Sequence, residues 1–105
     1  MANLYRINGL LDHLLREDAS ELDIVAESPP SILVQNERVA VGSASITNDN
    51  VANLLYNLAT VDQMRELNIC GDVRFIFLFR NWARFSIVAS TACDALSIKI
   101  KYLGR

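Results

Sequence analysis

Apolar residues recur at helical spacing in the first part of the chain. Between Leu4 and Leu15 they form one stripe, which predicts an amphipathic helix over about residues 4–17. His13 lies off this stripe, beside Asp12. It is therefore expected to be a solvated surface residue, and not a metal ligand or a catalytic group.

A strand, a rigid corner and a hairpin are predicted next. Residues 21–26 alternate between polar and apolar positions, the period of a half-buried strand. The Pro29-Pro30 pair ends this strand, because proline cannot donate to a ladder and holds the residue before it extended. Residues 32–34 are apolar, residues 38–41 have the sequence Arg-Val-Ala-Val, and Asn36 between them tolerates a left-handed turn conformation. These features indicate a hairpin.

Two short helices are predicted in the middle of the chain. Thr47 is a suitable N-cap, and an apolar stripe at helical spacing follows it. Thr60 and Gln63 fit a capping box, which starts a second helix through about Leu67. Gly71 is expected to end the helical section.

Three strands are predicted after the helices, over residues 72–80, 83–91 and 95–103. Their short connections favour antiparallel neighbours. The sequence therefore predicts one domain over residues 1–105, of α+β class, with a single antiparallel sheet and helices mainly on one face. The side chains expected to face the core are Val73, Phe75, Phe77, Phe79, Phe85, Ile87, Ala89, Leu96, Ile98, Ile100 and Tyr102.

The opposite face of these strands is the candidate interaction surface. Residues 1–72 hold four basic and eleven acidic residues, whereas residues 73–105 hold six basic residues and one acidic residue. This asymmetry marks a recognition face or arises by chance. Exposed apolar side chains among cations indicate a docking surface, unless the first helix or the N-terminal arm covers them. The expected partner-binding residues are Arg74, Ile76, Leu78, Arg80, Arg84, Lys99 and Lys101, with Val88 beside them.

Several kinds of chemistry find no support in the sequence. One histidine and two distant cysteines, Cys70 and Cys93, give no metal-ligand cluster and no cofactor handle. Glu21, Asp23 and Glu27 are expected to form a solvated or salt-bridged edge and not an acid–base pair. The cations lack an interleaved aromatic platform, so nucleic acid is not expected. No apolar run is long enough to insert in a membrane, and no signal peptide is visible, which predicts a cytoplasmic protein.

The residues around the Pro29-Pro30 corner resemble a known family. The block from Ala19 to Ile24 followed by Ser28-Pro29-Pro30 resembles the start of the N-terminal PAS-like domain of type IV pilus retraction ATPases and their type II secretion relatives. Residues 45–51 resemble the family's Leu-Thr-x-Glu-Asp helix start, and residues 83–85 resemble its Gly-Arg-Phe-Arg strand. The resemblance covers nearly the whole chain and implies a PAS-like fold.

The chain also departs from the family pattern. Asp23 stands where the family has histidine, Ser86 replaces the second arginine of the Gly-Arg-Phe-Arg strand, and Lys101 stands roughly where another arginine is common. In family members these arginines face the nucleotide of the following domain or a neighbouring subunit. Arg84 is kept, but lysine lacks the planar fork that grips phosphate. The family's two glycines and its asparagine are replaced here by Glu27, Asn36 and Val88.

The phosphate loop of the family's ATPase domain is absent from these 105 residues. That loop has the pattern GxxxxGK[ST], and the four glycines of this chain do not form it. We therefore expect no enzymatic activity and no cofactor, and a regulatory domain that docks to a hexameric pilus or secretion ATPase or its partners, with homo-oligomers possible. Two alternatives remain: an excised N-terminal domain of a full ATPase, and a small-molecule-sensing PAS-like module. Trp82 is either a clamp on the core edge or an exposed contact residue.

Overall fold

The structure is a computed structural model that describes residues 5–92 and 95–104. Three helices and one six-stranded sheet form in the described residues, which confirms the α+β prediction and is compatible with a PAS-like domain. Leu4, Cys93 and Asp94, the one acidic residue of residues 73–105, lie outside the described residues. In chain order the elements are α1 (Ile7–Arg16), β1 (Glu21–Val25), β2 (Ser31–Val34), β3 (Glu37–Ala40), α2 (Asn48–Tyr56), α3 (Val61–Cys70), β4 (Asp72–Phe79), β5 (Ala83–Ala92) and β6 (Ala95–Gly104).

The sheet has the strand order β3-β2-β1-β6-β5-β4, and every neighbouring pair is antiparallel. The predicted meander of β4, β5 and β6 is confirmed, and so is the β2–β3 hairpin. The central pairing of β1 with β6 was not predicted, and it sets Leu22 opposite Ile100. Both of these side chains are fully buried. Strand β1 therefore joins the β2–β3 hairpin to the C-terminal meander in one sheet.

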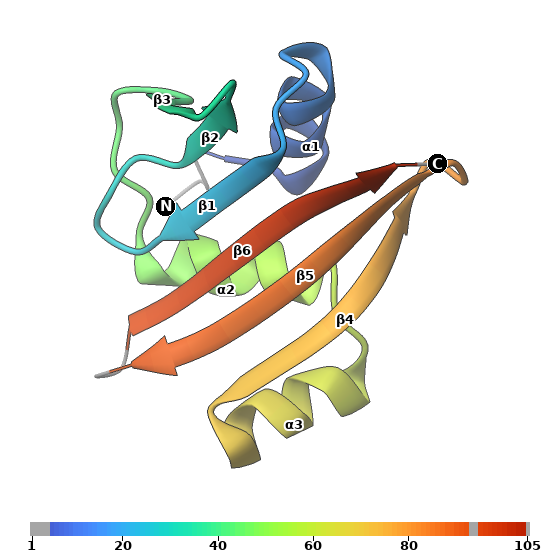
Figure 1. The fold of residues 1–105 in the computed structure, drawn as a ribbon. Helices are drawn as coiled ribbons and strands as arrows, with labels where there is room; N and C mark the ends of the chain where they lie inside the picture. The colour runs from blue at the N-terminus through green and yellow to red at the C-terminus, as the bar shows by residue number, and fades with distance from the viewer. Residues whose placement is uncertain (1–4, 93–94, 105) are drawn as a thin grey trace.

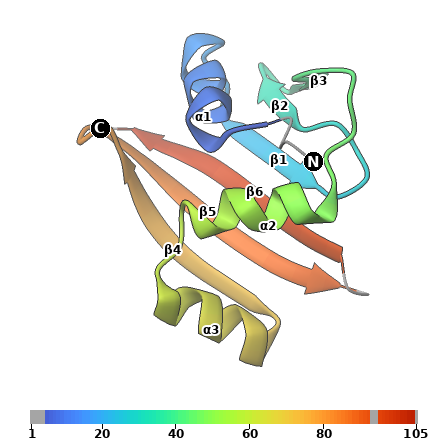
Figure 2. The same cartoon turned by 180° about the vertical axis from the view of Figure 1, so that it is seen from behind.

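Helices α1 and α2 lie on the same face of the sheet, and α3 lies beside β4 (Figures 1 and 2). The core forms between α1, α2 and this face, where Leu11, Leu14, Leu55 and Phe85 are completely buried. Full burial of such a side chain contributes about 1.5–3 kcal/mol relative to its exposure. The predicted inward positions of the meander are buried, with the exceptions of Phe77 and Tyr102, which are half-buried. Phe77 is on the edge strand β4, so fewer neighbours cover it.

Local hydrogen bonds fix the ends of α2 and α3 as predicted. Thr47 caps α2 by accepting from the backbone N–H of Asn50 at 3.1 Å. Thr60 and Gln63 form a reciprocal capping box at the start of α3, with bonds of 2.8 and 3.2 Å. Gly71 ends α3 in the left-handed conformation, with φ of 86°. These helix boundaries follow directly from the sequence.

Two tight turns place consecutive residues at positive φ. In the β2–β3 hairpin, Gln35 and Asn36 have φ of 50° and 68°. In the β4–β5 hairpin, Arg80 and Asn81 have φ of 55° and 66°. In the β2–β3 hairpin, where Val34 pairs with Glu37, positive φ at both central residues is the geometry of a two-residue turn that matches the twist of its strands. The β4–β5 connection has three residues, because Phe79 pairs with Ala83. The backbone therefore leaves the alternating strand pattern at Arg80.

Candidate functional site

The face of the sheet opposite α1 and α2, which we call the open face, collects cations from β4, β5 and β6. Arg74 lies opposite Val88, which in turn lies opposite Lys99. In the next row, Ile76 lies opposite Ser86, which lies opposite Lys101. Because alternate residues of a strand share a face, these rows are neighbours on one surface.

A third row completes the open face at the end of β4. Here Leu78 lies opposite Arg84, and Arg84 lies opposite Gly104 beside an irregularity in the β5–β6 register. Six of the seven predicted partner-binding residues therefore share the open face. Val88, predicted as an exposed neighbour, is half-buried among them.

Arg80, the seventh predicted residue, is placed differently. Its guanidinium donates to a carboxylate oxygen of Asp12 on α1 at 2.8 Å, and it lies over the Phe79 ring at 4.8 Å from the centroid. Simple alternation along the strand predicted that Arg80 would face outward with Arg74. The positive φ of the turn instead directs its side chain to α1, on the covered side of the sheet. Arg80 therefore connects the β4–β5 turn to α1.

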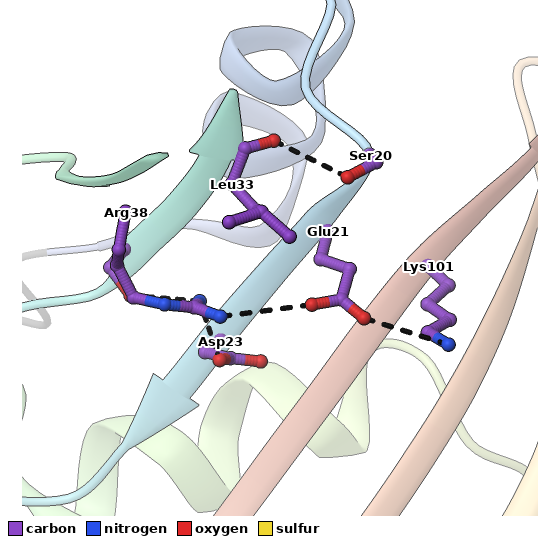
Figure 3. Close-up of polar contacts among 7 residues, drawn as sticks. Ser20, Glu21, Asp23, Leu33, Arg38 and Lys101 are labelled. Atoms are coloured by element: carbon purple, nitrogen blue, oxygen red, sulfur yellow. Dashed lines mark hydrogen bonds and ion pairs between the residues drawn. The ribbon is translucent and has the colours of Figure 1, made fainter. Parts of the chain in front are cut away.

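The part of the open face formed by β1, β3 and β6 carries a network of ion pairs (Figure 3). Arg38 of β3 pairs with Asp23 at 2.5 Å and with Glu21 at 3.7 Å. Lys101 of β6 contacts the other oxygen of Glu21 at 3.6 Å. The two acidic side chains are only 15% and 22% exposed, so they are shielded by their partners. Glu21 and Asp23 thus form the predicted salt-bridged surface, whereas Glu27 lies apart in the turn after β1.

The open face therefore divides into two halves of different character. The paired half consists of Glu21, Asp23, Arg38 and Lys101, whose charges largely cancel. The cationic half consists of Arg74, Ile76, Leu78, Arg84, Val88 and Lys99. Among the described residues, Arg74 and Lys99 have no acidic partner within 4.0 Å, while Ile76 and Leu78 are 60% and 52% exposed. The combination of apolar area and uncompensated positive charge is confined to this half.

Two surface clefts in the described part of the chain lie away from the open face. One, of about 560 Å³, is bounded by the N-terminal arm, the start of α1 and α2, with Tyr5 and Asn53 in its lining. The other, of about 390 Å³, lies between the end of α2 and α3, beside Tyr56 and Met64. The described residues contain no cluster of three or more potential metal ligands. Trp82 follows the β4–β5 turn and is 42% exposed, which leaves both of its predicted roles open.

No helix among the described residues has the length and apolar character needed to cross a membrane. The described helices are at most ten residues long, whereas a spanning helix needs about 20 apolar residues.

Comparison with known proteins gives similarity only at the level of structure. No protein-family model and no curated protein sequence matches the chain. The pilus retraction motor PilT, solved with bound ADP, superposes with a TM-score of 0.85 at 17% identity, covering 92% of this chain and 29% of PilT. The ATPase DotB of Legionella pneumophila superposes with a TM-score of 0.82 at 17% identity, covering 97% of this chain and 31% of DotB. DotB of Yersinia pseudotuberculosis gives 0.73 at 11% identity, covering 91% and 29%.

These similarities establish a shared fold. The chain has the fold of a part of the PilT and DotB ATPases and spans about three-tenths of the length of those proteins. The family resemblance that the motifs around Pro29-Pro30 suggested therefore holds for the three-dimensional structure. At this level of identity, function has to be argued from the residues of the open face.

Proposed function

We propose that this chain is a non-enzymatic interaction domain of a type IV pilus or type II secretion motor system. In this proposal residues 1–105 form one domain, which docks to a hexameric motor ATPase or to a partner of that motor in the cytoplasm. The fold shared with part of PilT and DotB supports the connection to such motors. The absence of a GxxxxGK[ST] loop from the sequence supports a role without ATP hydrolysis.

The observation that carries the proposal is the composition of the cationic half. Ile76 and Leu78 are large, exposed and adjacent, and the cations Arg74 and Lys99 flank them. A protein interface combines an apolar centre, which contributes affinity when it is buried, with a polar rim that sets orientation. Uncompensated cations on the rim favour an acidic partner surface and accelerate its association. The preferred partner surface is therefore acidic around an apolar centre.

A binding experiment with a purified hexameric retraction ATPase tests the proposal. We expect crosslinking or pull-down to detect association, and the double variant Arg74→Glu/Lys99→Glu to abolish it. The matched control is Arg65→Glu on α3, whose side chain is 65% exposed and pairs with Asp62 of the same helix. Loss of binding in both variants, or no association of the wild-type chain at tens of micromolar, would contradict the proposal.

Two other functions predict different results. If the chain is the N-terminal domain of a longer ATPase, Arg84 serves the nucleotide or a neighbouring subunit in the intact protein, and the length of the encoded reading frame decides this. If the chain is a small-molecule sensor, the clefts beside Tyr5 and Tyr56 are candidate ligand sites. A thermal-shift screen with metabolites would then raise the melting temperature, whereas the docking proposal predicts no stabilisation by small molecules.

A further inference from the structure

The two edges of the sheet differ in their protection against further strand pairing. An edge strand exposes unpaired backbone donors and acceptors, and proteins protect such edges with short strands and charged residues. The β3 edge is four residues long and contains Glu37 and Arg38. The β4 edge is eight residues long, and it contains no proline, glycine or lysine. Its two charges, Asp72 and Arg74, both lie in its first three residues. The part of β4 from Phe75 to Phe79 therefore lacks charged or proline protection.

The second part of β4 is the accessible part of this edge. Helix α3 lies beside the first part of β4, and the strand continues past it toward the β4–β5 turn (Figures 1 and 2). In that second part Ile76 and Leu78 are exposed on the open face, and Phe77 is half-buried on the other face. The accessible edge is thus apolar on both faces of the sheet.

We propose that β4 pairs with β4 of a second copy of this chain, antiparallel about a twofold axis at Phe77. This arrangement joins two six-stranded sheets into one continuous sheet. Ile76 of each copy then lies opposite Leu78 of the other, and the two Phe77 side chains meet on the covered face. Cross-strand contacts between apolar and aromatic side chains stabilise antiparallel pairs.

The structure favours this register over its neighbours. An axis at Phe75 would bring the second copy against α3, which flanks the first part of β4. An axis at Phe77 avoids α3 and sets Arg74 opposite Arg80 of the second copy. That pairing is tolerated because Asp12 already neutralises Arg80.

A second copy is the occupant that fits this edge best. It brings a strand of the same length and the same apolar character, and a twofold contact uses one patch on both molecules. The interface requires Ile76, Phe77 and Leu78 but not Lys99. A substitution at Lys99 therefore distinguishes the dimer from motor docking. Both contacts use Ile76 and Leu78, so the dimer and the motor compete for these two side chains.

Sedimentation velocity over a range of concentrations tests the dimer. We expect the wild-type chain, of 11.7 kDa, to approach twice that mass as concentration rises. Leu78→Lys should weaken the dimer at least tenfold, because it places a charge in the centre of the new interface. The matched control is Val39→Lys on the β3 edge, where Val39 is 45% exposed, and it should dimerise like the wild type. A wild-type chain that stays monomeric, or equal weakening by both variants, would overturn the proposal.

Hydrogen exchange locates the contact without a substitution. At concentrations that favour the dimer, we expect amides in residues 76–79 to exchange more slowly than in the monomer, while amides of β3 keep their rate. A dimer whose formation leaves β4 exchange unchanged would show that the copies meet elsewhere and would also overturn the proposal. The two tests are distinguishable, because Lys99→Gln on β6 should weaken docking but leaves every residue of the β4 edge in place.

Discussion

Asn50 shows how a single buried polar side chain holds the N-terminal arm in place. It is the one polar residue in the buried core of the described residues, at 3% exposure. Its amide oxygen accepts from the backbone N–H of Tyr5, and its amide nitrogen donates to the carbonyl of Tyr5, both at 3.2 Å. The Tyr5 hydroxyl donates to the carbonyl of Ala44 at 2.6 Å, and Gly42 leaves room for it. The arm is thereby attached to α2 and to the loop before it.

The substitution Asn50→Ala tests this attachment. It removes both bonds to Tyr5, so we expect the free energy of unfolding to fall by about 1–3 kcal/mol in urea denaturation. The control is Asn53→Ala in the same helix, an exposed position where the change should stay within about 0.5 kcal/mol. Equal effects of the two substitutions would show that the arm adds nothing to stability.

Individual contacts of the open face could be predicted only in part. The strand period correctly set Arg74, Arg84, Lys99 and Lys101 on one face. It could not show that Arg38 reaches Glu21 and Asp23, because that contact depends on β1 lying between β2 and β6. The alternation rule also failed at Arg80, since it does not include the positive φ of the turn.

At the scale of elements, local signals predicted more than long-range pairing. The caps at Thr47 and Thr60 and the end of α3 at Gly71 depend on residues three or four positions apart, so the sequence displays them. Helix α1 begins at Ile7, later than predicted, and its N-cap Arg6 provides no side-chain hydrogen bond. The β1–β6 pair joins opposite ends of the chain, and neither strand contains a signal for the other.

Replacing either of two glycines by alanine should change the stability of the protein, in opposite directions. Gly71 has φ of 86°, so Gly71→Ala should lower the free energy of unfolding by about 1–2 kcal/mol. Gly9 is exposed within α1 with no atom near the position of a new Cβ, so Gly9→Ala should raise stability by up to about 1 kcal/mol. Thermal unfolding of both variants against the wild type checks this. A destabilising Gly9→Ala would contradict the described α1.

At the scale of the whole molecule, the helices and the ion-pair network leave the cationic half as the surface for the proposed docking. Helices α1 and α2 cover one face of the sheet, and the network of Arg38 and Lys101 neutralises part of the other. The cationic half remains, with apolar side chains among its charges. Its contact with an acidic partner should weaken severalfold between low and high salt, because exposed charges are screened within about 10 Å at 0.1 M. Affinity titrations at several salt concentrations check this, and a salt-independent affinity would point to the apolar residues alone.

The most direct test of docking through the cationic half is a matched pair of charge removals on β6. Lys99 has no acidic partner within 4.0 Å among the described residues, whereas Lys101 pairs with Glu21. The affinity of Lys99→Gln and of Lys101→Gln for a hexameric retraction ATPase should be measured by calorimetry beside the wild type. We predict a clear loss of affinity for Lys99→Gln and a small change for Lys101→Gln. Equal affinities for all three chains, or the larger loss for Lys101→Gln, would contradict the central claim.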